Sequence, residues 1–507
     1  MSATASRHRR INYTLLPSGP SRAVEGEPVM EETKTPVELK TALINRALEE
    51  TGMGKYQWCI FFLCGFGYAL DLMWAQAFSL VTPRIQQELG VAVFSAGLTV
   101  GAFVWGLLVD IIGRRWAFNL TVGIVAAFGL VLGGLDSWSS ICGIVFFVGF
   151  GLGGNIPIDA TIVLEFLPND RRYLLAALSV FQPVGVIITS LLSWALIPRF
   201  ACQTDLPACS HVANPSSATC CTKADNYGWR YALFTIGGLS VAAFFARFVL
   251  FTFHESPKFL VTRGHDRRAV EVVEAVARFN GRQCTLSTRD LEECDKAESD
   301  ADGEGEPEKK TRKARVGHLG MLFSSWSMIR LTLLTWVCYA ADYWGFTIAG
   351  NFLPKFLADR GAAANDIVIA VVGVPGVLLG AALIEIPRFG RKWSMVLSSA
   401  LMGVSLFLYA TITTPAATVG FNAMEYFFQS TFNAVLYGWT PEAFPAAVRG
   451  SACGLASFWG RLSSIVAPLI AAHLGSSNGV LYLAGGGVLL CTLCALFLPD
   501  TKDTEVM

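Results

Sequence analysis

Two stretches of the chain carry the same charged pattern, EFLPNDRR at residues 165–172 and EAFPAAVR at residues 442–449. Each begins with a glutamate, has a proline three residues later and an arginine seven residues later, and follows a long apolar segment. The offset is 442 − 165 = 277 residues, and the Gly-Arg-Arg motif at 113–115 recurs as Gly-Arg-Lys at 390–392 with the same offset, 390 − 113 = 277. Motifs that repeat at a fixed spacing indicate an internal duplication.

The composition is that of a membrane protein. Of the 507 residues, 53% are hydrophobic and 15% are charged, and the mean hydropathy is +0.48, whereas soluble domains carry about 25% charged residues. Apolar runs of roughly 20 residues can cross a bilayer as helices. Such runs lie near 57–82, 91–111, 116–135, 140–163, 174–196, 230–252, 328–353, 366–386, 393–413, 416–438, 450–472 and 478–498. We therefore predict an all-α membrane protein with twelve transmembrane helices in two six-helix bundles.

The short loops divide the basic residues unequally. The loops LDSWSS (135–140) and GSSNG (475–479) contain no Lys or Arg. The loops on the other side contain Arg114, Arg115, Arg171, Arg172, Arg391, Lys392 and Arg449. Because short basic loops remain in the cytosol, we expect a multi-pass protein of the plasma membrane with both termini cytosolic.

These breaks divide the chain into parts. We expect a disordered cytosolic tail at 1–55 that includes a short helix near 37–50, and a cytosolic linker at 254–327 between bundles at 56–253 and 328–499; residues 500–507 form a second cytosolic tail. The polar start lacks the apolar core of a cleavable signal peptide, so we expect none. In the linker, RRAVEVVEAVARFNGR has apolar residues at helical spacing and predicts an amphipathic helix.

Four cysteines crowd the exterior loop at 199–229: Cys202, Cys209, Cys220 and Cys221. An oxidising exterior favours one or two disulfide bonds, and three complete pairings are open. A metal site is the alternative, but no CxxC spacing supports it.

Several of these motifs resemble the major facilitator superfamily. GLLVDIIGRR (106–115) matches the signature GxxxDxxGRR of that superfamily, and the repeated glutamate-to-arginine pattern matches the ExxxxxxR motif of its sugar-porter branch. ESP at 255–257 and PDTK at 499–502 are similar to the PESP and PETK motifs of that branch. GGNIPIDATIVLEFLP and GKYQWCIFFLCGFGYALD look more like synaptic vesicle glycoprotein 2 and related fungal and organic-ion transporters. The resemblance covers about residues 52–502.

The resemblance implies alternating access, with a substrate at the midplane between two bundles, and a cytosolic gate of charged residues. Carried over by position, the gate residues are Asp110, Gly113, Arg114, Arg115, Glu165, Arg172, Glu255, Glu385, Arg391, Glu442 and Arg449. The second half departs from the pattern, because Pro387 stands 277 residues after Asp110 and only Glu385 is near it, so we expect its share of the gate to be weaker or rewired. The alternative is that these pairs only fix helix ends.

Acids within the spans indicate coupling or substrate sites, since each costs about 2.5–3.5 kcal/mol on insertion scales. The resemblance implies that Asp71 and Asp159 handle protons or cationic solutes. The alternative is an acid that is merely hydrogen-bonded across helices. The complete set of coupling or substrate candidates is Asp71, Asp159, Asn155, Gln182, Asp342, Tyr343, Trp344 and Glu425.

Together these features predict a secondary active transporter of a small organic solute, coupled to protons. A sugar carrier and an efflux pump for a secondary metabolite or drug remain alternatives, although the span at 328–353 lacks the paired glutamines of sugar porters; a transporter-like nutrient receptor is less favoured. The chain has no GxxxxGK[ST] motif for ATP and only six histidines, which disfavours an enzyme. We expect a monomer in a lipid bilayer with no cofactor and, at zero net charge, no nucleic-acid partner.

Overall fold

The computed structural model describes residues 36–89, 95–202, 221–249, 253–299, 319–359, 366–387, 389–412, 414–474 and 477–501. Helices dominate these ranges, and no β-strand occurs within them. The predicted all-α class is therefore confirmed.

The first half supplies one bundle of helices. It consists of α2 (Lys55–Leu89), α3 (Ser95–Ile112), α4 (Arg114–Leu132), α5 (Trp138–Leu152) followed by α6 (Asn155–Phe166), α7 (Tyr173–Ala177) followed by α8 (Phe181–Leu196), and α9 (Gly228–Val249). The breaks between α5 and α6 and between α7 and α8 lie within single apolar segments. Each bent pair therefore crosses the bundle as one unit.

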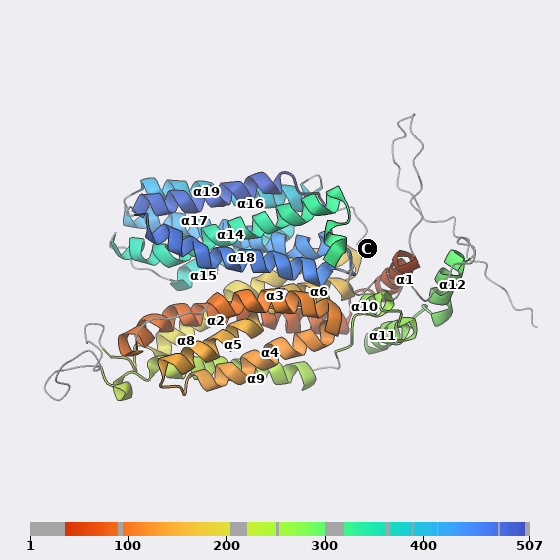
Figure 1. The fold of residues 1–507 in the computed structure, drawn as a ribbon, viewed down its shortest axis with the longest axis horizontal. Helices are drawn as coiled ribbons and strands as arrows, with labels where there is room; N and C mark the ends of the chain where they lie inside the picture. The colour runs from red at the N-terminus through yellow and green to blue at the C-terminus, as the bar shows by residue number, and fades with distance from the viewer. Residues whose placement is uncertain are drawn as a thin grey trace, which may run out of the picture. The chain divides into compact units, whose positions relative to one another are not determined.

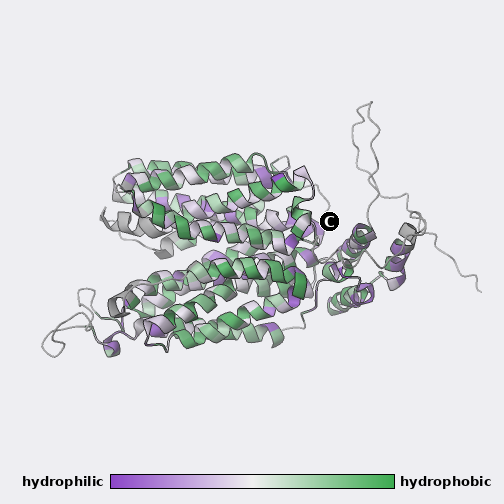
Figure 2. Cartoon of the chain, viewed as in Figure 1, coloured by the Kyte–Doolittle hydropathy of each residue, from purple (hydrophilic) through white to green (hydrophobic). Residues whose placement is uncertain are grey.

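The second half supplies the other bundle. It consists of α14 (Trp326–Asp359), α15 (Asp366–Leu383), α16 (Gly390–Thr411), α17 (Pro415–Ala443), α18 (Arg449–Ala472) and α19 (Ser477–Ala495). Figure 1 shows the two halves side by side, and Figure 2 shows hydrophobic residues along both. In the described ranges, eight helices are long and apolar enough to cross a membrane, and two shorter apolar helices span Ala96–Ile112 and Ala370–Leu383.

The halves meet most extensively along two seams, α3 against α18 and α8 against α15, and α6 and α7 also contact α17. In the first seam the helix backbones touch. A Cβ atom added at Gly454 would lie 2.1 Å from the Cα of Gly106. Only glycine allows this approach, because a side chain at either position would separate the helices.

Short helices gather at one end of the bundles, which we call the linker end (Figure 1). They are α1 (Pro36–Thr51), α10 (Pro257–Thr262), α11 (Asp266–Phe279) and α12 (Thr288–Ser299). The short helix expected near 37–50 within the tail is therefore present, and it spans Pro36–Thr51. Burial is the reason, since α1 packs on α10, α11 and α12, and Lys40 Nζ lies 2.5 Å from Asp266 Oδ2 and 2.7 Å from Asp295 Oδ2. Residues 1–35 lie outside the described ranges.

A disulfide bond marks the opposite end of the first bundle, which we call the disulfide end. It joins Cys202 to Cys221, which confirms that the loop contains a disulfide. Cys209 and Cys220 lie outside the described residues. Beside the bond, Arg84 Nη1 donates to the carbonyl of Cys202 at 3.3 Å, which ties the loop to α2.

Candidate functional site

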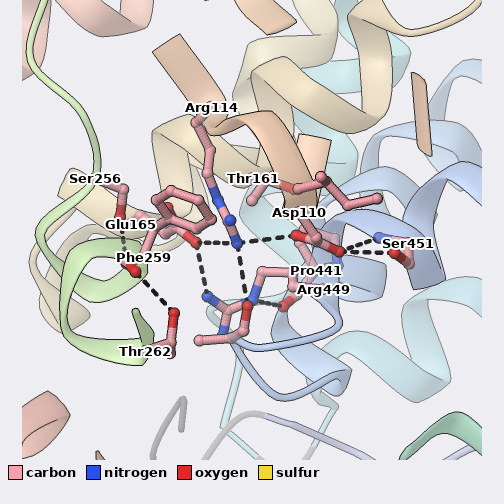
Figure 3. A network of polar contacts seen from close by, with 12 residues as sticks. Asp110, Arg114, Thr161, Glu165, Ser256, Phe259, Thr262, Pro441, Arg449 and Ser451 are labelled. Carbon is pink, nitrogen blue, oxygen red and sulfur yellow. Dashed lines mark hydrogen bonds and ion pairs between the residues drawn. The ribbon is translucent and has the colours of Figure 1, made fainter. Parts of the chain in front are cut away.

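A network of buried charges, which we call the latch, joins the two halves at the linker end (Figure 3). It begins at Asp110, near the end of α3. Asp110 Oδ2 accepts hydrogen bonds from the backbone N of Ser451 at 2.6 Å and from its Oγ at 2.8 Å. Ser451 lies in the first turn of α18, where backbone N–H groups favour a carboxylate. A first-half acid thus binds a second-half helix start.

Glu165, at the end of α6, holds one arginine from each half. Its Oε1 lies 3.3 Å from Arg114 Nη2 and 3.5 Å from Arg449 Nη1. Arg114 Nη2 also lies 3.1 Å from Asp110 Oδ1 and donates to the carbonyl of Ala446 at 3.1 Å. Because these side chains are buried, removing one charge would leave its partner unpaired at a cost of several kcal/mol.

The second half does not repeat this network. Arg391 forms a bidentate pair with Glu442, with Nε–Oε2 at 3.1 Å and Nη2–Oε1 at 3.3 Å. Thr501 Oγ1 donates to Glu442 at 3.0 Å, so these contacts remain within one half. Glu385 is exposed in the turn after α15. Charge at the latch is therefore distributed asymmetrically between the repeats.

Glu255 connects the linker to the latch. Its carboxylate accepts from the backbone N of Arg114 at 2.8 Å and from that of Arg115 at 3.3 Å, and so caps the start of α4. The side chain of Arg115 itself is exposed. Gly113 has φ 99°, and a Cβ there would lie 2.4 Å from Glu255 Oε2. Glycine is required here on both grounds.

Two further cations lie beside the latch. Arg172 donates to Asn169 in its own loop. Lys258 of α10 is buried; burial lowers the pKa of its ammonium to about 7, the positive charges of Arg449 and Arg172 act in the same direction, and Glu165 opposes them. Lys258 therefore loses its proton, and its positive charge, more easily than an exposed lysine.

A cavity of about 570 Å³ lies between the halves and is lined by both. Its lining includes Ala96 and Leu98 at the start of α3 and Leu469 near the end of α18, toward the disulfide end. Asp110 follows Leu98 by 110 − 98 = 12 residues, which is about 18 Å of helix. The cavity thus extends toward the disulfide end, whereas the latch lies at the linker end.

An ion pair crosses this cavity from one half to the other. Arg461 Nη2 of α18 lies 3.7 Å from Asp71 Oδ2 of α2, and Asn155 Nδ2 donates to Asp71 Oδ1 at 3.1 Å. Arg461 was absent from the predicted site residues. The signal was available, because SFWGRLSSIVAP places one arginine in the middle of an apolar span.

Three other predicted residues also line the cavity: Gln182, Asp342 and Tyr343. Asp342 has no ion pair or side-chain hydrogen bond with the part of the chain that the structure describes, and it acts electrostatically on Glu425, which is buried. Tyr343 accepts a hydrogen bond from Tyr437 at 3.1 Å. The second half therefore contributes two acids without a cation partner, in the described ranges, at or near the cavity.

Four predicted residues are not part of the cavity lining: Asn155, Asp159, Trp344 and Glu425. Trp344 points to α19, where its Nε1 donates to the carbonyl of Leu483 at 3.2 Å. Asp159 is buried within the first half, so close to α2 that a Cβ at Gly67 would overlap its carboxylate. Within the described ranges, no group of three or more His, Cys, Asp or Glu side chains is placed to hold a metal ion.

Comparisons with known proteins agree with this architecture. The family described as Sugar (and other) transporter matches residues 35–507. MFS siderochrome iron transporter 1 of Ceriporiopsis subvermispora is 36% identical, over 91% of this chain and 90% of its own length. An MFS-type transporter of Schizosaccharomyces pombe is 35% identical over 91% and 88%.

Among solved structures, the proton:xylose symporter XylE bound to 6-bromo-6-deoxy-D-glucose is similar to this chain. The TM-score is 0.67 at 18% sequence identity, and the match covers 89% of this chain and 98% of that one. At this identity the likeness concerns the fold alone, and it confirms the predicted twelve-helix arrangement.

Proposed function

The chain belongs to the sugar (and other) transporter family of the major facilitator superfamily, and from this premise we propose that it is a proton-coupled secondary active transporter of a small organic solute. Members of this family carry small solutes across membranes, so the protein is a transporter and not an enzyme. The proposal adds the coupling ion, the site and the orientation.

The observation that carries the proposal is the Asp71–Arg461 pair. It spans the two halves inside the cavity at 3.7 Å, so any change in the charge of Asp71 alters the attraction between the halves. Protonation of Asp71 would remove this attraction and free Arg461. A group that can gain a proton at the contact between two moving bundles is suited to couple the proton gradient to alternating access.

The latch opposes opening of the linker end. Opening the linker end requires breaking the Asp110–Ser451 and Glu165–Arg449 contacts, which join the halves only in the closed arrangement. The two hydrogen bonds from Ser451 to Asp110 are charge-assisted and contribute about 1.5–3 kcal/mol each, and the Glu165–Arg449 contact is an ion pair. Closure of the cavity at the disulfide end must offset this cost, as expected for two states of similar free energy.

We propose that the linker end faces the cytosol, with both termini there, and that the protein works as a monomer in the plasma membrane. Two observations support the orientation. The basic residues of the short loops, such as Arg115 and Arg171, lie at the linker end. The Cys202–Cys221 bond lies at the other end, and disulfide bonds persist in oxidising compartments.

A carrier of a polyhydroxylated solute such as a sugar is the second candidate. The amides of Gln182, Gln429 and Asn433 line the cavity and can bind hydroxyl groups. Export of a metabolite or drug uses the same machinery, because gradients set the direction. The relative named for siderochrome iron suggests a further cargo, which the same assay can test.

The test lets the protein select its substrate from a mixture. Proteoliposomes with an inside-alkaline pH gradient are incubated in a metabolite extract, and the solutes they accumulate are identified by mass spectrometry. We expect one solute class to accumulate with wild-type protein. Asp71→Asn should abolish accumulation but retain exchange of the same solute across equal pH. Gradient-driven accumulation by Asp71→Asn at the wild-type level would refute coupling through Asp71.

A further inference from the structure

Arg461 is a buried cation with unused hydrogen-bonding capacity. Its guanidinium has five N–H donors, yet in the described ranges it makes no hydrogen bond, and its Nε is buried without a partner. Its contact with Asp71, at 3.7 Å, is an ion pair that is too long for a hydrogen bond. A buried guanidinium normally has its donors satisfied, so Arg461 is placed to bind a ligand that accepts hydrogen bonds from them.

Asp71 is able to release Arg461, because it has a second partner. Asn155 donates to Oδ1 of Asp71, while Oδ2 faces Arg461 and makes no hydrogen bond. Asp71 also acts electrostatically on two other titratable groups, Asp159 of α6 and Tyr343 of α14. Neither is a cation. If Arg461 were taken by another anion, Asp71 would be left as an uncompensated carboxylate.

We infer that the transported solute carries a carboxylate, which docks on Arg461 in place of Asp71. The inference rests on the proposed function and names its substrate class. A planar carboxylate matches the paired N–H donors of a guanidinium. Once displaced, Asp71 takes up one proton, Arg461 keeps its charge, and the net charge of the cavity is unchanged. One carboxylate and one proton therefore enter together.

The rest of the cavity restricts this class further. Among the described residues that line the cavity, Arg461 is the one Lys or Arg, so a second carboxylate on the solute would be buried without a cation to pair with. The walls include the rings of Tyr343, Phe346 and Tyr426, which suit a flat apolar body. The site thus favours a small monocarboxylate with an aromatic or apolar body, and a basic nitrogen on that body is accommodated by Asp342.

The test uses purified full-length protein and matched probes that differ only in the carboxylate. The probes are benzoate with benzamide, pyridine-3-carboxylate with pyridine-3-carboxamide, and phthalate as a dicarboxylate. Thermal stabilisation reports binding to the folded state. We expect the two monocarboxylates to stabilise the protein, with an effect that grows as the pH falls from 8 to 6, while the amides and phthalate have at least tenfold weaker effects.

Three variants distinguish carboxylate binding by Arg461 from a purely structural role of this residue. The double variant Asp71→Asn/Arg461→Gln removes one charge of each sign, so the net charge of the cavity is unchanged and the protein should fold, but it should bind monocarboxylates about 10- to 100-fold more weakly. Asp71→Asn alone retains Arg461, so it should bind them at least as tightly as wild type and independently of pH. Arg267→Gln, at an exposed position of α11, is the control and should behave as wild type.

Equal stabilisation by amide and carboxylate, unchanged binding by the double variant, or no response to either monocarboxylate would each overturn the inference. Failure of the proposed function is distinguishable. In that case the monocarboxylates would bind with the expected variant pattern, but no solute would accumulate in proteoliposomes under a pH gradient.

Discussion

Replacing Asp110 with alanine should open the latch. The substitution removes two hydrogen bonds to Ser451, at 2.6 and 2.8 Å, and leaves Arg114 with Glu165 as its ion-pair partner. Hydrogen bonds to an ionised group contribute about 1.5–3 kcal/mol each, and a carboxylate at a helix start adds about 0.3–1 kcal/mol. We therefore expect the closed arrangement to lose at least about 3 kcal/mol, a shift of about 100-fold toward the state open at the linker end.

A native thiol can report this shift. Cys453 lies one turn along α18 from Arg449, is buried, and is close enough to Asp110 to interact with it electrostatically. Opening of the latch separates α18 from α3 and exposes this thiol to water. In Asp110→Ala, alkylation of Cys453 by N-ethylmaleimide, followed by mass spectrometry of the corresponding peptide, should be about 100-fold faster than in wild type. Solute uptake should fall while surface expression is retained.

Asp170→Ala is the matched control, because Asp170 lies at the same end of the bundle but its side chain is 70% exposed. Such a change is worth at most about 0.5 kcal/mol, so neither labelling nor uptake should change. If Asp110→Ala labelled Cys453 at the wild-type rate and transported normally, the latch would have no gating role. The contacts would then serve only to fix helix ends.

Three further predictions test other parts of the structure. Gly454→Ala places a Cβ against the backbone of α3 and should abolish solute uptake. Gly238→Ala is the control and should leave uptake intact, because a Cβ there meets nothing within 4 Å. Normal uptake by Gly454→Ala would show that transport does not need the close contact between α3 and α18. Burial lowers the pKa of Lys258 from 10.5 to about 7, so the folded state binds fewer protons than the unfolded state between these values. The free energy of unfolding should fall by up to about 1.4 kcal/mol per pH unit as the pH drops from 10 to 7 and then level off. Thermal melts of Lys258→Met should lack this slope. Equal pH dependence of wild type and Lys258→Met would contradict a lowered pKa at Lys258. Replacing Cys202 and Cys221 together with serine, which removes a bond of sequence separation 19, should lower stability in chemical denaturation by about 3 kcal/mol; an unchanged midpoint would mean that other contacts hold the loop.

The sequence was sufficient to predict the fold because its repeat and its apolar runs are long-range signals. Helix ends were harder to predict. The first span was expected at 57–82, but α2 runs from Lys55 to Leu89, since a helix can continue into water after its apolar stretch ends. Hydropathy also did not reveal the break at Gly153 and Gly154, where close packing on α3 rather than polarity decides the backbone.

The latch residues could be selected by motif, and the structure brings Asp110, Arg114, Glu165 and Arg449 together; their gating role stays a prediction. The cavity was harder to predict. Arg461 was missed because the charged candidates within the spans were limited to acids. Trp344 was expected at the cavity but faces α19. Position along a helix does not indicate which neighbour a side chain meets, so sequence alone could not separate these cases.

The pairing of Lys40 with Asp266 also affects biosynthesis, because the partners are separated by 226 residues. At about 5–20 residues per second, a ribosome needs roughly 10–45 s to make the intervening chain. During this delay the apolar face of α1, with Ile44 and Leu48, is already synthesised while the helices that bury it are not. The nascent chain is therefore exposed to aggregation and degradation at its amino-terminal side, and an affinity tag or truncation there would act on protein yield before it could act on transport.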